Sequence, residues 1–324
     1  MISLKMKART AVALLAIITA ALSTAAQSAG KSRPNTIENL YDAFGPQKKG
    51  TVLDWGFSVL IEYRGKTILF DSGNDVDKFR HNVEALGVDL QKVDVAVLSH
   101  RHLDHISGFQ YMLQVKPQVE AYLPDDQILG APVPFRVAPE TPEARQQLAG
   151  MSPEELYFGG AKSVTQGTSG PFPHANIAYV GKTRQIGPGI WLIYTTSPLL
   201  GEFNAYPPSE PGHPELIGMP EISLALETDG GIALITGCSH SKVETIAAAA
   251  REATGKKITL LEGGFHLLPY DAATIEKLAN QLKNELGVER VAPAHCTGNL
   301  GFKILKQVYG RNYSYAGVES VVEF

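Results

Sequence analysis

Ser99-His-Arg-His-Leu-Asp-His-Ile-Ser-Gly108 is the stretch that decides how this chain of 324 residues is read. It places His100, His102, Asp104 and His105 within six positions. Three imidazoles and a carboxylate at one point need a cation, because each needs a partner once water is removed and protonated imidazoles repel one another. Imidazole with carboxylate suits Zn²⁺, Fe²⁺ or Mn²⁺ better than Ca²⁺ or Mg²⁺, which prefer oxygen ligands. The motif therefore predicts a transition-metal site.

Upstream of this motif, the pattern of apolar and polar residues predicts strands and a helix. The expected elements are, in order, strands Ser58–Tyr63 and Thr67–Phe70 around a turn at Arg64-Gly65, a helix between Asp75 and Gly87, and strand Val93–Leu98. Asp71 follows the second strand and is expected to lie beside the motif. It either orients a metal ligand or is a plain turn residue.

Three more predicted strands near the end of the chain are each followed by a histidine. They are Ile232–Thr236 before His240, Ile258–Leu261 before His266, and Arg290–Pro293 before His295. Helices are expected between them, one opened by a capping box of Ser241 and Glu244 and ended by Gly255, the next running from Asp271 to Gly287. In open α/β sheets, ligands bind beyond the carboxyl ends of the strands. Four strand ends are therefore predicted to supply histidine to one edge.

These motifs resemble the metallo-β-lactamase superfamily, whose hallmark is HxHxDH at a strand end. The other matching segments are Leu69–Gly73, Thr236–His240, Glu262–Leu268 and Pro293–Gly298. The last three are similar to the branch grouped with the dihydropterin ribofuranosylaminobenzene phosphate synthases. The resemblance implies an α/β fold, an αββα sandwich of two mixed sheets flanked by helices. The resemblance also implies a single domain over residues 31–324, with a variable substrate-pocket segment at about 110–220. His213 lies in this segment, and it is expected either to reach the site or to be simply exposed.

The resemblance also implies a ligand set for one or two transition-metal ions, with zinc expected and Fe²⁺ or Mn²⁺ as alternatives. His100 and His102 would bind one metal, and Asp104, His105 and His295 the second. The chain departs from the family by having Cys238 where a bridging Asp is usual, and by lacking the usual third histidine near Pro220–Leu224. Cys238, His240 or both are expected to fill these roles.

The residues expected to act in catalysis are Asp104 and His266. His266 would donate a proton or bind the substrate; alternatively its imidazole is satisfied by backbone. The function implied is a hydrolase that uses a metal-activated hydroxide on a small ester, lactone, lactam or phosphoester. The alternatives are a pterin-pathway synthase-like enzyme and a non-catalytic periplasmic module that binds metal or ligand.

Residues 1–30 resemble an export signal peptide. Lys5, Lys7 and Arg9 form a basic region, Ala11–Leu22 an apolar one, and small residues follow that suit cleavage after Ala26. A periplasmic or secreted protein with no stable membrane span after cleavage is expected; an uncleaved anchor is the alternative. The two cysteines, Cys238 and Cys296, could then form a disulfide, although both lie inside histidine motifs.

The formal net charge of -4 provides no basic surface for a phosphate backbone. A small-molecule substrate is therefore expected and a nucleic acid is not. The sequence leaves the oligomeric state open.

Overall fold

The computed structural model describes residues 34–126, 146–157, 172, 174–197 and 219–324. Contacts divide the chain into a unit from Met1 to Pro34 and a unit from Asn35 to Phe324, and the fold below is that of the second. His213 and the expected export signal lie outside the described residues. No helix within the described ranges is both long enough and apolar enough to cross a membrane.

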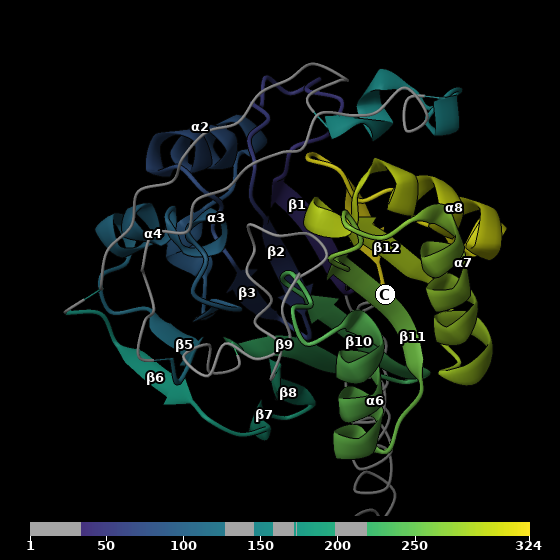
Figure 1. The fold of residues 1–324 in the computed structure, drawn as a ribbon. Helices are drawn as coiled ribbons and strands as arrows, with labels where there is room; N and C mark the ends of the chain where they lie inside the picture. The colour runs from purple at the N-terminus through teal and green to yellow at the C-terminus, as the bar shows by residue number, and fades with distance from the viewer. Residues whose placement is uncertain (1–33, 127–145, 158–171, 173, 198–218) are drawn as a thin grey trace, which may run out of the picture. The chain divides into compact units, whose positions relative to one another are not determined.

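Two β-sheets stack on each other, and helices cover the outer face of each (Figure 1). The first sheet has the spatial order β13-β1-β2-β3-β4-β5-β6, with β1 at Thr36–Tyr41, β2 at Ser58–Tyr63, β3 at Lys66–Phe70, β4 at Val95–Val97, β5 at Glu120–Pro124, β6 at Ile177–Val180 and β13 at Val321–Glu323. The second has the order β12-β11-β10-β9-β8-β7, with β7 at Arg184–Gly187, β8 at Ile190–Ser197, β9 at Met219–Thr228, β10 at Gly231–Thr236, β11 at Ile258–Gly264 and β12 at Val291–Ala294. Both sheets contain parallel and antiparallel pairs, so the predicted αββα sandwich is confirmed.

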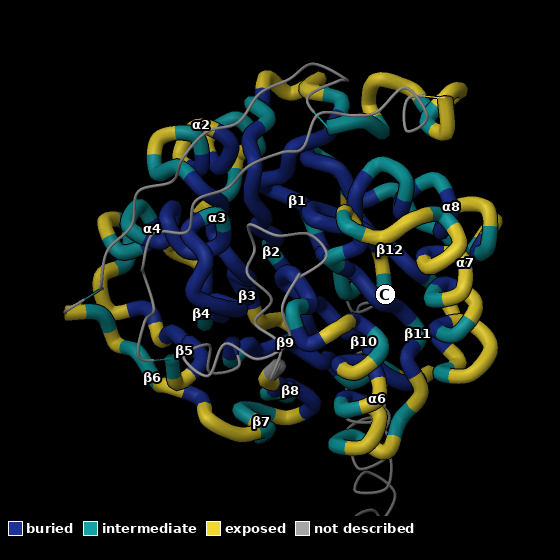
Figure 2. The backbone as a smooth tube through the Cα atoms, in the orientation of Figure 1, coloured by how far each residue is buried: buried dark blue, intermediate teal, exposed yellow. Residues whose placement is uncertain are grey.

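Three apolar layers hold the sandwich together, and Figure 2 shows the strands as the most deeply buried elements. The central layer joins the inner faces of the two sheets, with Ile61 and Phe70 from the first and Leu224 and Ile235 from the second. Helices α2 (Val76–Leu86) and α4 (Phe109–Val115) cover the outer face of the first sheet. Helices α6 (Val243–Thr254), α7 (Ala272–Asn280) and α8 (Asn299–Tyr309) cover the second. Burial of apolar surface on both faces of each sheet thus stabilises the fold.

Most of the predicted helix ends are confirmed. Asp75 accepts hydrogen bonds from the amides of Asp77 and Lys78, and Gly87 ends α2 in the left-handed conformation. Gly255 ends α6 in the same way, and Asp271 caps α7. After α7 a π-helical turn, Gln281–Glu285, continues the chain toward Gly287.

The predicted capping box at the start of α6 is wrong. The helix begins at Val243 with Lys242 as its N-cap, and no side chain caps it. The amide of Ser241 instead donates to Glu221 on β9, at 2.5 Å. Because this carboxylate holds Ser241, the helix starts one position later than the capping box predicted, with Lys242 in place of Ser241 as the N-cap.

Other differences arise where pairing partners are distant in sequence. Strand β4 is shorter than Val93–Leu98 because Val93 closes a 3₁₀ turn, Leu90–Lys92, at its start. Strand β1 and the edge strand β13 were not predicted, and they pair with each other from opposite ends of the unit. The remaining short elements are α3 (Leu103–Ile106) and the 3₁₀ turns Pro153–Glu155, His295–Thr297 and Gly310–Asn312.

Strands β10, β11 and β12 are parallel neighbours joined through α6 and α7, so the predicted βαβαβ unit is confirmed. In the first sheet β3 and β4 are parallel as well. The carboxyl ends of these strands are followed by Asp71 and Ser99 in one sheet and by Gly237 in the other. A Cβ on Gly237 would lie 2.1 Å from Ser99 Oγ, so the two sheets meet closely at this edge.

Candidate metal centre

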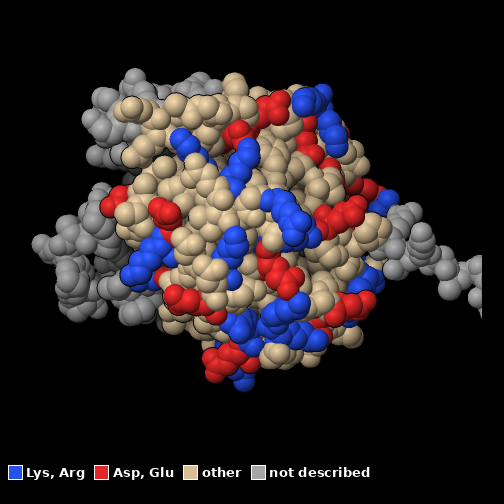
Figure 3. Space-filling view, turned by 90° about the vertical axis from the view of Figure 1, so that its right-hand side faces the viewer, with Lys and Arg blue, Asp and Glu red and all other residues tan. Residues whose placement is uncertain are grey.

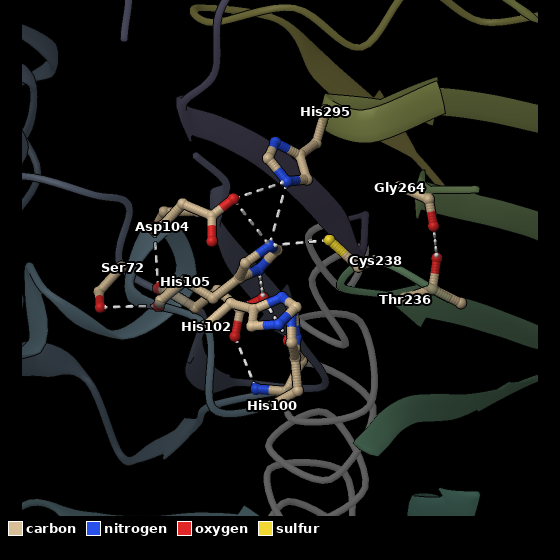
Figure 4. A network of polar contacts seen from close by, with 12 residues as sticks. Ser72, His100, His102, Asp104, His105, Thr236, Cys238, Gly264 and His295 are labelled. Carbon is tan, nitrogen blue, oxygen red and sulfur yellow. Dashed lines mark hydrogen bonds and ion pairs between the residues drawn. The ribbon is translucent and has the colours of Figure 1, made fainter. Parts of the chain in front are cut away.

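The strand ends of both sheets bring seven histidine, aspartate and cysteine side chains to one place, and Figure 4 labels all of them except His240. The loop after β4 carries His100 and His102, and α3 carries Asp104 and His105. Cys238 and His240 follow β10, and His295 follows β12. The predicted convergence of strand ends on one edge is therefore what the fold produces.

Three imidazoles form the first ligand group. His100 Nε2 lies 3.0 Å from His102 Nδ1 and 3.3 Å from His240 Nε2. His100 is fully buried and His102 nearly so. His240 therefore occupies the place of the third imidazole that the sequence lacks near Pro220.

The second group joins two imidazoles to a carboxylate. His105 Nε2 lies 3.1 Å from His295 Nε2, and Asp104 Oδ2 lies 3.3 Å from His295 Nε2 and 3.8 Å from His105 Nε2. The two histidines are fully buried, whereas the side chain of Asp104 is 19% exposed. Asp104 is thus the member of this group that solvent reaches.

The sulfur of Cys238 lies between the two groups. It is 3.1 Å from His105 Nε2, and it falls within 4.8 Å of the ligand atoms of both His100 with His240 and His105 with His295. Cys238 and Cys296 are both free thiols, and Cys296 Sγ donates a hydrogen bond to the carbonyl of Cys238 at 3.4 Å. The alternative of a disulfide is not what the structure contains.

The spacing of these atoms fits a metal ion. Zinc–nitrogen bonds of about 2.0–2.1 Å in a tetrahedron place two nitrogen ligands roughly 3.3–3.4 Å apart. The distances of 3.0 to 3.3 Å between imidazole nitrogens are close to that edge. Facing imidazole nitrogens are poor partners for one another when both are unprotonated, so nitrogen, sulfur and carboxylate oxygen in this arrangement match the donors of a transition-metal site.

Burial prepares the first group for a cation. It lowers the pKa of His102 to about 3 and holds the pKa values of His100 and His240 well below the usual range, because the charged imidazolium is desolvated and the neighbouring imidazoles repel it. These imidazoles are therefore neutral at pH 7. His295 differs: burial lowers its pKa, but electrostatic interactions with Cys296, Asp104 and Asp42 and a hydrogen bond to Asp104 outweigh burial and raise it to about 9.

Asp71 contacts His105 directly, and His100 through Ser99, on the side of each ring away from the other ligand atoms. Its Oδ2 accepts from Ser99 Oγ at 2.7 Å, its Oδ1 accepts from the Ser99 amide at 2.6 Å, and Ser99 Oγ lies 2.8 Å from His100 Nδ1. His105 Nδ1 lies 2.6 Å from Asp71 Oδ2. The prediction that Asp71 lies beside the motif is confirmed, and its contacts with Ser99 and His105 fit the orienting role better than that of a plain turn residue.

Two further carboxylates at the site were not predicted. Glu221 on β9 accepts from the amides of His240 and Ser241, which fixes the loop that carries His240. Asp42, at the end of β1, accepts from the amide of His295 at 2.9 Å. Burial raises the pKa of Asp42 to about 7. The only sequence signal for either was a carboxylate within or just after an otherwise apolar run.

Backbone strain gathers at the same strand ends. Eight described residues other than glycine have positive φ, and five of them lie here: Asp71, Ser239, Lys242, His266 and His295. Such conformations cost free energy and persist only where the surroundings hold them. Ser239 is held by its hydroxyl, which donates to the Gly264 carbonyl at 2.6 Å.

His266 lies beside the first group and outside both ligand triangles. Its ring centroid is 4.5 Å from that of His240. It shares a third set of atoms within 4.8 Å with Cys238 and Cys296. His266 is thus close enough to the centre to contact a substrate, and with the two cysteines it also offers a third set of potential metal ligands.

Comparison with known proteins agrees with this geometry. Residues 55–295 match the family model of the metallo-beta-lactamase superfamily. The chain is 25% identical, over 83% of its length and 90% of the relative's, to the 7,8-dihydropterin-6-methyl-4-(beta-D-ribofuranosyl)-aminobenzene-5'-phosphate synthase of Methanocaldococcus jannaschii.

Two solved structures share the fold. One is Tm1679, a metal-dependent hydrolase of the beta-lactamase superfamily, with a TM-score of 0.62, 24% identity, and coverage of 90% of this chain and 99% of that one. The other is the metallo-beta-lactamase fold protein YhfI from Bacillus subtilis, with a TM-score of 0.52, 15% identity, and coverage of 90% and 99%.

Proposed function

The chain belongs to the metallo-beta-lactamase superfamily, and from this premise we propose that it is a metal-dependent hydrolase of a small-molecule ester, lactone, lactam or phosphoester. The observation that carries the proposal is the pair of ligand groups that meet at Cys238. The first group consists of three imidazoles, and the second consists of Asp104, His105 and His295. A structural metal site would need one closed set of ligands, whereas two adjoining sets with an exposed edge leave room for a reacting group.

Each ligand group would hold one metal ion, with zinc as the metal that best fits imidazole, thiolate and carboxylate together. When bound there, a metal ion would supply Lewis acidity for activating water and polarising the substrate. The chain holds the imidazoles rigidly through Asp71 and Ser99 and keeps bulk water away by burial. Asp104, which is partly exposed, and His266, which lies beside the ligand groups, are the side chains that would meet the substrate.

The second candidate is a synthase of the kind named for the Methanocaldococcus jannaschii relative, whose printed activity concerns a pterin bearing an aminobenzene ribofuranosyl phosphate. The similarity of 25% over nearly the whole of both chains favours it. The same site without turnover, as a metal- or ligand-binding module, is the third.

Metal analysis combined with a substrate panel separates these functions. Purified protein is expected to contain one to two transition-metal ions per chain and to hydrolyse at least one of a set of chromogenic esters, lactones, a cephalosporin and phosphoesters. Dipicolinate should abolish the turnover and added zinc should restore it. Full metal occupancy with ligand binding and no turnover would instead favour the module.

Variants locate the activity at the site. His100→Ala and His102→Ala are expected to lose metal and activity. His81→Ala is the matched control, because His81 is an exposed residue of α2 that contacts the Gly50 carbonyl. Unchanged metal content in both site variants would overturn the assignment of the centre.

We also propose that the protein is exported, on the strength of the basic and apolar residues 5–22. Intact mass of protein from the cell envelope or medium should show an N-terminus near Gln27. A retained Met1 in protein from the cytoplasm would refute this. The one face drawn in Figure 3 mixes Lys and Arg with Asp and Glu, and together with the net charge of -4 this supports a small-molecule substrate over a nucleic acid.

A further inference from the structure

A cavity of about 230 Å³ opens beside the metal centre. His240 and His266 form part of its wall, and His240 Nε2 is the atom that lies 3.3 Å from His100 Nε2. On the other side the wall is formed by α7, including Lys277 and Leu278. The cavity therefore runs from the imidazoles to the surface between α6 and α7.

The charges around this cavity are mainly positive. Lys242 and Lys277 both line it, and Glu244 is the one acidic residue of the described wall. Both lysines are exposed, and neither forms an ion pair within 4 Å with a described residue. Other lysines are engaged, for example Lys78 with Asp54 at 3.0 Å and Lys257 with Glu289 at 2.6 Å. The two cavity lysines thus remain available to an anion.

The backbone holds Lys242 in an unfavourable conformation at this place. Its φ of 72° and ψ of 131° lie in a region that residues with a Cβ rarely adopt, and it is the N-cap of α6 without capping the helix. A glycine would relieve the strain and an Asn or Ser would cap better, so a lysine here serves neither purpose. Lys242 instead places an ammonium group beside the cavity.

Part of the wall is apolar. Phe265, Leu267 and Leu278 line the cavity, together with polar groups from Ser239, Thr274 and Gln281. An occupant would therefore carry charge at one end and an apolar body next to it. Lysine binds phosphate as a point charge, and two lysines match the two charges of a phosphate monoester.

We infer that this cavity binds the phosphate end of a phosphorylated small molecule, with Lys242 and Lys277 contacting the phosphate and the organic part reaching His240 and His266. The inference rests on the proposed function and names its substrate class. The bond cleaved at the metal centre is then in the organic part of the substrate, and the phosphate serves for recognition.

Binding of phenylphosphonate tests this without turnover, because its carbon–phosphorus bond is not a hydrolase substrate. Calorimetry on the metal-loaded protein is expected to show binding that weakens about fivefold in Lys242→Gln or Lys277→Gln and about thirtyfold in the double variant. Lys66→Gln, on an exposed lysine at the start of β3, is the control and should bind as the unaltered protein does. Metal content should be equal in all of them.

Equal affinity of the double variant and the unaltered protein would overturn the inference, as would binding of benzoate as tight as that of phenylphosphonate. A second measurement does not depend on variants: phenylphosphonate should protect Lys242 and Lys277, but not Lys66, from acetylation by acetic anhydride. Absence of hydrolysis with lysine-dependent binding intact would refute the proposed reaction and leave the binding site standing.

Discussion

His105 Nδ1 lies 2.6 Å from Oδ2 of Asp71, and both side chains are fully buried. The carboxylate accepts the proton of Nδ1, so Nε2, the atom that faces His295 and Cys238, is left without one. Asp71 also accepts a hydrogen bond from the Ser99 hydroxyl, which in turn contacts His100. One carboxylate therefore orients a residue of each ligand group.

Asp71→Asn is expected to lower metal affinity by roughly ten- to hundredfold, because an amide can donate to Nδ1 and reverse the tautomer of His105. Competition with a chromophoric chelator measures this. Asp77→Asn is the matched control, since Asp77 lies on the surface of α2 with an ion pair to Arg80. Identical affinities for the two variants would show that Asp71 does not set the tautomer.

Cys238→Ser is expected to reduce the bound metal, because the thiol lies between the two ligand groups, whereas Cys296→Ser should retain more of it. Metal should protect Cys238 from iodoacetamide, and chelation should expose it. If denatured, unreduced protein has no free thiol and mass spectrometry joins Cys238 to Cys296, a disulfide replaces this assignment.

The two metal positions should respond differently to pH. His100, His102 and His240 have lowered pKa values and are already neutral at pH 6, so affinity at the first group should change little between pH 9 and 6. His295, whose pKa is raised to about 9, is protonated below that pH, and a metal must displace its proton. Affinity at the second group should therefore fall by up to about tenfold for each pH unit below 9. Chelator titrations at pH 6, 7, 8 and 9 check this, and two constants that fall in parallel would contradict it.

Gly237→Ala is expected to lower the free energy of unfolding by about 3 kcal/mol, because the new Cβ would lie 2.1 Å from Ser99 Oγ. Urea unfolding measures the change. At Gly181 the nearest atom to a new Cβ is 3.7 Å away, so Gly181→Ala should change the free energy by less than about 1 kcal/mol. Equal effects of the two substitutions would show that the sheets can separate at Ser99.

Much of the site could be predicted from the histidines that follow the predicted strands. Helix boundaries at Asp75, Gly87 and Gly255 depend on residues next to them in the chain, so local patterns predict them. The parallel order of β10, β11 and β12 follows from the βαβαβ alternation. Histidines after those strands therefore had to meet.

What could not be predicted depends on contacts between distant residues. Glu221 is 19 positions from His240, and its hydrogen bond to that amide is visible only once β9 and β10 are paired. A second hydrogen bond to Glu221, from the Ser241 amide, accompanies the start of α6 at Val243 in place of the expected capping box. Strands β1 and β13 likewise find each other only after the sheet has formed.

The positive φ angles of Asp71, Ser239, His266 and His295 lower the stability of the metal-free fold. Each such residue costs of order 1–3 kcal/mol, a sum comparable with the net stability of many domains. A metal that binds only the folded state adds stability in proportion to the logarithm of its free concentration. Metal-bound protein would therefore resist proteolysis, and metal-free protein would be degraded sooner. The abundance of the protein would then depend on the availability of the ion.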